Sequence, residues 1–478
     1  MFRLLALAAW AWSTPLHAGE TDCRQFYSAV DSAISRADVR DAQDSQVKGY
    51  PYLRSNRFLA GEIKIVRSDE QLDFLLQQMI TLEQRARGLE LHNLPAAELA
   101  RLERMQREMF PSQSDISTAL DECGKALIAI DRAQPAAIKR AACAPIHYSL
   151  LKRLLGFYPL TAIPFSRGIR KFQTDTSAAF TKNISASDRD PSTMVYTAQD
   201  AQPVDAAAIL RDSSDNPLHI PLPSPDQLAQ LFDQFAPNFA IANHGDFDRP
   251  GAVGLGNNGK STVDTSTPKI YVLASHTRFA EQTLLQLNYV IWFSERPKKG
   301  KFDMLGGALD GLIWRVTLTP DGEPLLYDSI HPCGCYHLFF PTDKLRAKPR
   351  HPSLQEHAYV PQAAPHVNPG ERLTIWVESG THYIVRVTAS EANPTRAGIT
   401  YQLADYDELR SLSQAEGTRR SLFRSDGLIH GSERGERIFF WPMGIASAGA
   451  MRQWGHHATA FVGMRHFDDP DLIDKAFE

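Results

Sequence analysis

Long apolar runs are missing from this 478-residue chain after its first twenty residues. A membrane-spanning helix needs about 20 consecutive apolar residues, so we expect no transmembrane segment in the mature protein. A basic excess is also missing. The formal net charge of −4 excludes the strong positive field that a nucleic-acid-binding protein uses. Only five cysteines are present, and the 43% hydrophobic content is typical of a globular protein.

The first eighteen residues have the pattern of a secretory signal peptide. Arg3 precedes the short apolar run from Leu4 to Trp12, and Leu16-His17-Ala18 offers a small-residue cleavage site before Gly19. Leu16 is less usual at the third position before a cut, so an uncleaved anchor is the alternative. We expect a signal peptide over residues 1–18 and a periplasmic protein that folds where disulfides form.

Residues 19–172 are predicted to form an α-helical domain. Apolar residues recur there at spacings of three and four, which is one face of a helix. Because charged residues flank each stripe, the helices are expected to pack against one another as a bundle. The stripes are Cys23, Phe26, Val30 and Ile34; Leu72, Leu75, Met79, Leu82 and Ala86; Leu99, Leu102, Met105 and Met109; and Ile116, Leu120, Cys123, Leu127 and Ile130.

Two cysteines lie on these predicted buried stripes. Cys23 and Cys123 are therefore expected to form a disulfide, which ties the beginning of the mature chain to the last long helix. A disulfide between Cys123 and Cys143 is the alternative. In either case one of these three cysteines is left over, and a small buried hydrophobic side chain is its simplest role.

Residues 148–172 are at once apolar and basic, with several leucines beside Lys152, Arg153, Arg167, Arg170 and Lys171. An amphipathic segment that lies on a membrane surface has this composition. So does a helix that docks on a second domain or on an envelope partner. Pro159 and Pro164 break the segment, which favours docking within the protein.

A change of pattern divides the rest of the chain. Residues 173–222 are rich in Thr, Ser, Asp, Ala and Pro and are predicted to be a linker or irregular segment. Residues 223–478 are predicted to form a second domain made mainly of antiparallel strands with added helices. The predicted fold class of the whole chain is therefore α+β.

Hairpins are the clearest elements of the second domain. Leu312 to Leu318 and Leu325 to Ile330 are strand-like and flank a Pro-Asp-Gly turn, and Thr374 to Val387 repeats the pattern around Ser379-Gly380. Ile438 to Trp441 is predicted to be a further strand. Phe279 to Tyr289 is the main predicted helix.

The densest chemical motif is His331-Pro332-Cys333-Gly334-Cys335-Tyr336-His337. Thiolate and imidazole are ligands for copper and zinc, so His331, Cys333, Cys335 and His337 are the candidate metal ligands. Four residues on a straight strand span about 20 Å, too far for one ion, but Pro332 and Gly334 predict a curled loop. A strained, reducible Cys333–Cys335 disulfide and a cysteine nucleophile beside a histidine are alternatives. A purely structural pair of cysteines is the simplest explanation.

Two weaker constellations accompany this motif. His244, Asp246 and Asp248 precede a glycine-rich loop and are candidate catalytic residues, since a histidine with carboxylates can act as a general base. Solvated surface side chains are the alternative. Arg452, Trp454, His456 and His457 suit an anionic or sugar-like ligand, or else they are packing residues of a core.

No motif in the sequence determines a reaction. The first hypothesis is an exported protein that binds a soft metal, copper or zinc, through His331 to His337. The second is a cell-envelope hydrolase that uses a cysteine with a histidine, or His244 with its aspartates. The third is a non-enzymatic envelope interaction protein with a structural Cys333–Cys335 pair. Whether the protein is an enzyme stays open at this point.

Overall fold

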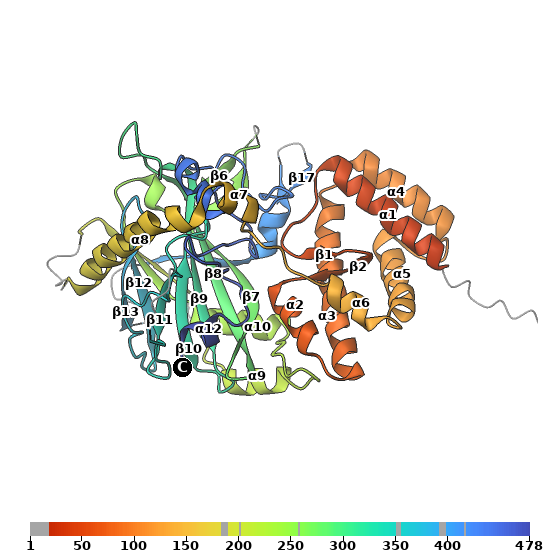
Figure 1. Ribbon diagram of the computed structural model, residues 1–478, viewed down its shortest axis with the longest axis horizontal. Helices are drawn as coiled ribbons and strands as arrows, with labels where there is room; N and C mark the ends of the chain where they lie inside the picture. Colours follow the sequence, from red (N-terminus) through yellow and green to blue (C-terminus); the bar gives the residue numbers. More distant parts are fainter. Residues whose placement is uncertain are drawn as a thin grey trace, which may run out of the picture.

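The computed structural model describes residues 19–182, 190–199, 202–256, 259–349, 355–391, 398–414 and 417–478. The predicted signal peptide, residues 1–18, lies outside these ranges. A helical N-terminal half is followed by a half rich in β-strands (Figure 1), so the predicted α+β class is confirmed. None of the described helices is both long enough and apolar enough to cross a membrane.

The N-terminal half consists of helices that surround a short hairpin, and its apolar stripes form one buried core. Side-chain caps define several of the helix starts: Ser68 Oγ accepts the Gln71 N–H, and Asp115 Oδ1 accepts the Thr118 N–H. The elements are α1 (Glu20–Ala37), β1 (Ser45–Val47), β2 (Tyr50–Ser55), α2 (Arg57–Ile65), α3 (Asp69–His92), α4 (Ala96–Met109), α5 (Ile116–Asp131) and α6 (Pro135–Ala141).

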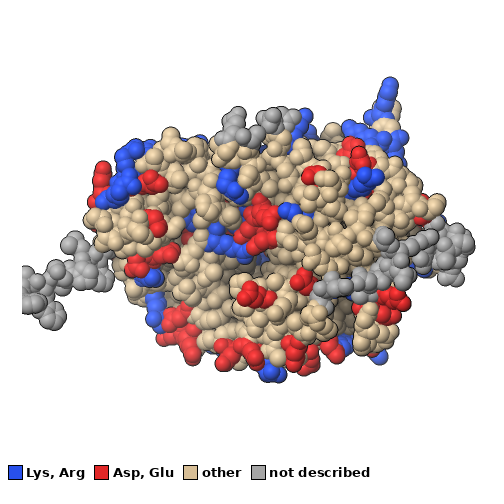
Figure 2. Space-filling model, turned by 180° about the vertical axis from the view of Figure 1, so that it is seen from behind, with Lys and Arg blue, Asp and Glu red and all other residues tan. Residues whose placement is uncertain are grey.

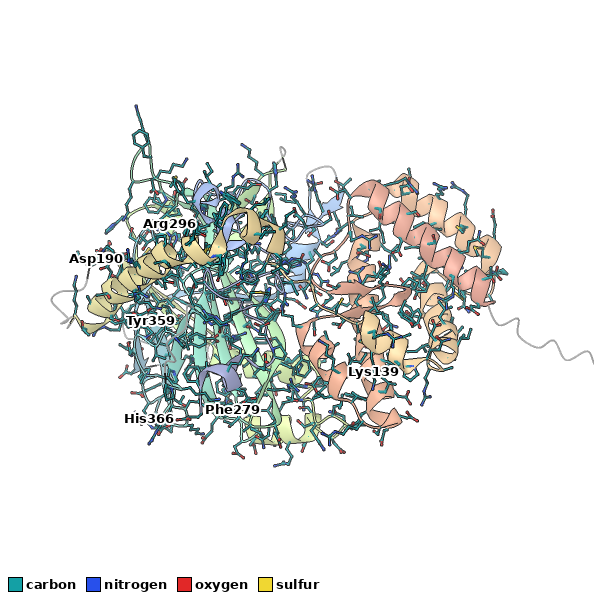
Figure 3. All side chains as sticks on the ribbon, in the orientation of Figure 1. Lys139, Asp190, Phe279, Arg296, Tyr359 and His366 are labelled. Atoms are coloured by element: carbon teal, nitrogen blue, oxygen red, sulfur yellow. A yellow bond between two sulfur atoms is a disulfide. The ribbon has the colours of Figure 1, made fainter. Side chains whose placement is uncertain are left out.

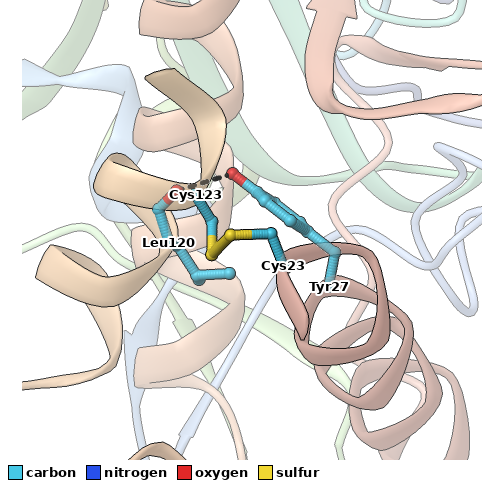
Figure 4. Close-up of a disulfide and its surroundings, with 4 residues drawn as sticks. All are labelled: Cys23, Tyr27, Leu120 and Cys123. Carbon is cyan, nitrogen blue, oxygen red and sulfur yellow. Dashed lines mark hydrogen bonds between the residues drawn. A yellow bond between two sulfur atoms is a disulfide. The ribbon is translucent and has the colours of Figure 1, made fainter. Parts of the chain in front are cut away.

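A disulfide joins Cys23 of α1 to Cys123 of α5 (Figure 4), as the stripe positions predict. Both residues are fully buried. The Tyr27 hydroxyl donates to the Leu120 carbonyl oxygen at 3.0 Å and fastens the same two helices one turn away. Cys143 is free and exposed, so the alternative pairing is not the one formed.

Two sheets form the C-terminal half. Among the described residues, one sheet has six strands in the order β11-β10-β9-β8-β7-β15, and another has five in the order β13-β12-β4-β3-β14. Most pairs are antiparallel, while β12 with β4, β14 with β3 and β15 with β7 are parallel. One hydrophobic core contains residues of both sheets, including Trp314 and Phe239.

The strands of these sheets and of the smaller hairpins are β3 (Thr193–Thr197), β4 (Asn238–Ala242), β5 (Ala252–Leu255), β6 (Ser261–Asp264), β7 (Lys269–Phe279), β8 (Gln282–Arg296), β9 (Gly307–Leu318), β10 (Pro324–Ile330), β11 (Leu338–Pro341), β12 (Glu371–Val377), β13 (Ile384–Glu391), β14 (Ile399–Thr400), β15 (Gln402–Asp405), β16 (Leu412–Ser413) and β17 (Arg419–Arg420). The helical pieces are α9 (Ala206–Ser213), α10 (Pro225–Phe235), η1 (Asp246–Asp248), η2 (Tyr406–Arg410), α11 (Arg437–Phe440), η3 (Trp441–Met443) and α12 (Leu472–Ala476).

Both predicted hairpins are confirmed, as β9–β10 and β12–β13. The prediction of a helix over Phe279 to Tyr289 is wrong, because these residues end β7 and begin β8. Strand β8 lies inside the sheet and is buried over most of its length, so the alternation of polar and apolar residues that marks a half-exposed strand is lost. The predicted strand at Ile438 to Trp441 is instead α11 and the start of η3.

Helices α7 (Leu150–Leu155) and α8 (Tyr158–Thr181) lie over the sheets and not with α1–α6 (Figure 1). The Tyr359 hydroxyl, on the residue labelled beneath α8 in Figure 3, donates to the Gln173 carbonyl oxygen at 2.6 Å. Helices α7 and α8, within the predicted helical domain 19–172 or reaching beyond it, thus contact residues of the strand-rich half. The predicted linker 173–222 contains the end of α8, strand β3 inside a sheet, and α9.

A buried network of charges joins the two halves. Asp41, from the helical half, accepts hydrogen bonds from Arg410 Nε at 2.9 Å and Nη2 at 2.6 Å and from Gln453 Nε2 at 2.9 Å. On its other side, Arg54 donates to Glu83 and Glu90, both at 2.7 Å. Burial opposes ionisation of Asp41, but the Arg410 charge and its hydrogen bonds outweigh burial and lower the pKa of Asp41 to about 2.

The remaining surface has no field of one sign on the face seen in Figure 2, where acidic and basic side chains are interspersed. This distribution agrees with the small net charge of −4. The buried network is thus the main concentration of charge that bears on stability, since exposed ion pairs contribute little.

We expect Asp41→Ala to lower the free energy of unfolding by about 3–5 kcal/mol, because it removes the two-oxygen partner of the buried Arg410 guanidinium, which then keeps only the Asp407 carboxylate among the described side chains. Urea denaturation monitored by circular dichroism measures this loss. Lys125→Ala removes an exposed ion pair with Glu122 and serves as the control, with no measurable change expected. Equal stability of Asp41→Ala and the wild type would show that the network does not stabilise the fold.

Candidate functional site

A cavity of about 550 Å³ lies between α8 and the loop that joins β10 to β11. This volume is within the range of about 300–1,000 Å³ that small-molecule pockets occupy. We call it the α8 pocket. Its lining is Pro164, Phe165, Gly168, Ile169, Phe172, Gln173, Leu305, Cys335, Tyr336, His337, Glu356, His357, Tyr359, Tyr383, Glu436, Phe440, Thr459, Phe461 and Arg465.

The loop from His331 to His337 is curled, as Pro332 and Gly334 predict. The His331 N–H donates to the Cys335 carbonyl oxygen at 3.0 Å, and the Gly334 N–H donates to the His331 carbonyl oxygen at 2.7 Å. Gly334 has a φ of +90°, and a Cβ atom placed there would lie 2.4 Å from the Ala458 carbonyl oxygen. Glycine is therefore required at this position.

The two histidines of the curled loop contact different aspartates. His331 Nδ1 lies 3.6 Å from Asp310 Oδ1, whereas His337 Nε2 lies 2.9 Å from Asp328 Oδ2. Across the part of the chain that the structure describes, no group of three or more His, Cys, Asp or Glu side chains is arranged to hold a metal ion. A four-ligand site that uses both histidines is thus not assembled.

Cys333 and Cys335 are free, buried thiols that contact each other. Their hydrogen bond, together with burial, raises the pKa of the Cys335 thiol well above its ordinary value. Arg452 Nε donates to the Cys333 carbonyl oxygen at 3.2 Å, and its guanidinium forms no ion pair with a carboxylate of the described chain. Burial lowers the pKa of Arg452. The Cys333 and Cys335 side chains have the largest opposing effect and favour the charged form of the guanidinium.

His337 lines the α8 pocket, and one of its ring nitrogens is unused. The Asp328 carboxylate is held by Arg315 at 2.8 and 2.5 Å, and it orients His337 from behind. Burial lowers the pKa of His337 to about 3, so the ring is neutral. Because a carboxylate only accepts, His337 Nε2 carries the proton, and Nδ1 is left as an acceptor. That Nδ1 atom is buried without a hydrogen-bond partner among the described residues.

Glu436 is a second polar group of the pocket that the sequence did not single out. Its carboxyl has no hydrogen-bond donor within the described ranges, and 8% of the residue is exposed. Burial raises the pKa of Glu436 to about 7, against the opposing charges of Arg296 and Arg434 and with a smaller contribution from Asp310 and Asp303. A carboxyl near neutrality in an apolar pocket is characteristic of functional sites.

Aromatic rings close one end of the pocket. Tyr336 and Tyr383 meet edge to face at 4.5 Å between ring centroids, and Phe172 of α8 packs on Tyr336 at 5.0 Å. Arg296 lies over the Tyr383 ring at 5.0 Å and donates to its hydroxyl at 3.2 Å. Tyr336 has a φ of +62°, a rare conformation for a non-glycine residue that turns its backbone between the two site residues Cys335 and His337.

His244, Asp246 and Asp248 do not converge. Asp248 is buried and accepts from the Ser379 hydroxyl and the Gly380 N–H, both at 2.7 Å, and from the His244 N–H at 2.8 Å. The His244 ring instead pairs with Asp190 at 2.7 Å, and Asp246 is an exposed partner of Arg249. Asp248 therefore serves as a structural acceptor that ties η1 to the β12–β13 turn.

His382 is the residue that this part of the sequence analysis missed. It is fully buried, with Nδ1 2.7 Å from Asp310 and Nε2 3.4 Å from Asp248, and it stacks on Phe293 at 3.9 Å. Burial opposes its protonation, but the hydrogen bonds and charges of the two aspartates raise its pKa. His331, Asp310, His382 and Asp248 thus form a continuous buried chain behind the pocket.

Arg452, Trp454, His456 and His457 lie in the interior and not on a surface. The Trp454 N–H donates to the Tyr406 hydroxyl, and His456 Nε2 bonds the Ala42 carbonyl oxygen at 2.6 Å. His457 lies beside the Trp454 ring. His456 thus contacts the helical half, while Arg452, Trp454 and His457 are buried in the strand-rich half, as in the packing alternative.

An exposed apolar surface borders the α8 pocket. Leu150 is 72% exposed, Leu154 75% and Phe302 94%. We call this set the apolar surface: Ile146, Leu150, Leu151, Leu154, Leu155, Phe157, Leu160, Ile163, Phe302, Met304, Ile438, Phe439 and Trp441. These residues belong to α7, the first turns of α8, the loop 298–304, α11 and η3, with Ile146 before α7 and Phe157 between α7 and α8.

We expect Glu436 to make stability depend on pH. Folding raises the pKa of Glu436 from 4.5 to about 7. Its contribution to the free energy of unfolding is therefore fully present below pH 4.5 and is lost as the pH rises through 7. Glu436→Gln should therefore gain stability relative to the wild type between these limits, by roughly 3 kcal/mol. Chemical denaturation at both pH values checks this, and a constant difference would contradict it.

Comparisons with protein-family models, with curated proteins and with solved structures find no match for this chain. The function of the α8 pocket and of the apolar surface beside it is therefore argued from their own geometry and chemistry.

Proposed function

We propose that this protein is a periplasmic, peripheral membrane protein that docks on a lipid bilayer through the apolar surface. The observation that carries the proposal is the exposure of large apolar side chains on neighbouring elements, including Leu154 at 75%. Soluble monomers rarely expose contiguous apolar patches of large size, and larger patches mark protein or membrane contacts. The choice between these two depends on the charges and the shape of the surface.

The elements of the apolar surface are held together as one unit. The Ser149 N–H, just before α7, donates to the Gly444 carbonyl oxygen at 2.8 Å, and Arg153 Nε donates to the Met443 carbonyl oxygen at 2.8 Å. The Glu436 N–H, before α11, bonds the Met304 carbonyl oxygen at 3.3 Å. The exposed side chains are therefore presented by a fixed scaffold.

Basic side chains accompany the apolar ones, and acidic side chains are rare among them. Residues 146–171 contain no Asp or Glu, while Arg167, Arg170 and Lys171 are exposed along α8. Lys298, Lys299 and Lys301 are exposed beside Phe302. Anionic lipid headgroups attract such residues by about 1 kcal/mol each, so this mixture favours a bilayer.

The loop 298–304 supports a bilayer over a protein partner. Phe302 is 94% exposed at the end of this loop and is flanked by lysines. The loop projects at the upper right of Figure 2, where basic side chains form its end. A protruding loop with a basic end and an exposed phenylalanine beside it suits the charged headgroups and the apolar interior of a membrane surface.

Export is supported by two independent features. The first eighteen residues have the pattern of a signal peptide. The Cys23–Cys123 disulfide is the kind of bond that persists in oxidising compartments such as the bacterial periplasm. The bilayer that we propose is accordingly one that faces the periplasm.

We expect Leu154→Glu combined with Leu155→Glu to weaken vesicle binding at least tenfold. Burying a leucine contributes about 1.5–3 kcal/mol, and about 1.4 kcal/mol is a factor of ten. Co-sedimentation of the full mature chain with vesicles of phosphatidylglycerol and phosphatidylcholine in equal parts measures the affinity. Because both leucines are exposed, the fold should be unaffected.

Ile130→Glu is the matched control, since Ile130 is exposed on α5 of the helical half and is not part of the apolar surface. It should bind vesicles like the wild type. Replacing Lys298, Lys299 and Lys301 by Gln should weaken binding to these anionic vesicles and reduce its salt dependence. If the wild type sediments with no vesicles, the proposal is wrong.

A soft-metal site is the second candidate function, and the contact between the Cys333 and Cys335 thiols favours it. Two thiolates are suitable ligands for Cu(I), and the buried Arg452 charge beside them would offset part of the negative charge. His331 and His337 bond to aspartates and are not needed in such a site. The proposed donor set is thus smaller than the four ligands predicted from sequence.

Elemental analysis of protein purified anaerobically tests this candidate. We expect about one copper or zinc per chain, lost in the variant with both Cys333→Ser and Cys335→Ser. Cys143→Ser is the control, since Cys143 is exposed and distant in sequence from the thiol pair. Wild-type protein without a stoichiometric metal would exclude the candidate and leave a structural dithiol.

A further inference from the structure

We infer that the α8 pocket binds a single-chain amphiphile whose hydroxyl or amine head is held by His337 and Glu436. The inference rests on the proposed membrane docking only for the source of the ligand, which is the bilayer. The evidence for the site itself is the cavity, its apolar walls and the unpaired polar atoms of His337 and Glu436 in its lining.

The walls are suited to a hydrocarbon chain. Phe165, Ile169 and Phe172 of α8 line one side, and Phe440 and Phe461 line another. Phe165 packs on Phe440 at 5.1 Å, so the aromatic rings form a continuous lining. A cavity of about 550 Å³ accommodates one small molecule, whereas a lipid with two long chains is larger.

The polar lining favours a head that donates hydrogen bonds. His337 Nδ1 is a buried acceptor without a partner, and the proton on its other nitrogen is used by Asp328. The Glu436 carboxyl also lacks a donor in the described part of the chain. A hydroxyl or an amine satisfies both groups, and satisfying a buried polar atom is worth more than an exposed contact.

A carboxylate head fits less well. It offers no hydrogen to His337 Nδ1, and it would lie near the acid groups of Glu436 and Glu356. The guanidinium of Arg465, the Arg among the lining residues, is already bonded to Thr459 and to the Glu356 carbonyl oxygen. The pocket therefore selects against an anionic head while it accepts the same apolar chain.

Helix α8 connects the pocket to the apolar surface. Leu160 and Ile163 are exposed in its first turns, and Pro164 and Phe165, next in the sequence, line the cavity. Trp441 is exposed one residue after Phe440, which lines the pocket. Apolar side chains therefore follow one another along α8 from the apolar surface to the α8 pocket, and a ligand can move between the two along them.

Isothermal titration with three probes of equal chain length tests the inference in solution without vesicles. Dodecylamine below its critical micelle concentration and dodecanol below its solubility limit should bind the mature chain with about one site, and dodecanoate at least tenfold more weakly. Gly168→Phe should abolish binding, because a Cβ at Gly168 meets open space and the ring would fill the cavity. Gly88→Phe is the matched control on α3, also with open space, and should bind normally.

Glu436→Gln provides a second variant that keeps the pocket's shape. It should reduce the affinity for dodecylamine more than that for dodecanol, because the ammonium group loses an ion pair whereas the neutral alcohol keeps a polar partner in the side-chain amide that this substitution introduces. Equal binding of all three probes, or binding that Gly168→Phe leaves intact, would overturn the inference. The titration contains no vesicles, so a negative titration does not contradict the proposed membrane docking. A failure of vesicle binding likewise does not contradict ligand binding in the α8 pocket.

Discussion

The ion pair between Asp41 and Arg410 lies at the junction of the two halves, and the segments that build the site are fixed relative to it. Arg54, Arg87 and Arg410 are balanced there by Asp41, Glu83 and Glu90. Asp44 is a fourth buried acid, and burial raises its pKa to about 6, which limits the excess negative charge. The same Asp41 accepts from Gln453, so the irregular C-terminal segment is anchored to the helical half by this network. Buried charges of this kind add to specificity only when each has its partner, and here each arginine does.

The anchored C-terminal segment forms part of the wall of the α8 pocket. The segment from Glu436 to Arg465 has little regular structure, yet it supplies Glu436, Phe440, Phe461 and Arg465 to the lining. Its position depends on contacts with residues far away in sequence, such as His456 with Ala42. Gly334 acts from the opposite side, since its backbone approaches Ala458 too closely for any side chain. The buried charge network and the close approach at Gly334 thus both contribute to holding this largely irregular segment in place.

The sequence predicts what is local and misses what is assembled from distant segments. The apolar stripes placed Cys23 and Cys123 on buried faces because helical period is visible within a few residues, and the disulfide followed. Turn residues identified the hairpins for the same reason. Strand β8 was misread because burial on both faces removes the alternation that identifies strands. The curl of His331 to His337 was predictable from Pro332 and Gly334. The contacts of His331 with Asp310 and of His337 with Asp328 were not predictable, because both aspartates lie on strands outside this loop.

Helix α8 explains why an apolar surface and an apolar pocket occur together. A surface helix of a globular protein normally has one apolar stripe and one polar face. The first turns of α8 are apolar on the exposed side as well, while its later part carries Arg167, Arg170 and Lys171 outward and Ile169 and Phe172 inward. An exposed apolar end lowers solubility unless it is covered, and stability of the fold does not require it. In the docking that we propose, a bilayer covers that end, the bases lie at headgroup level, and the pocket beneath the helix opens beside the hydrocarbon from which its ligand comes.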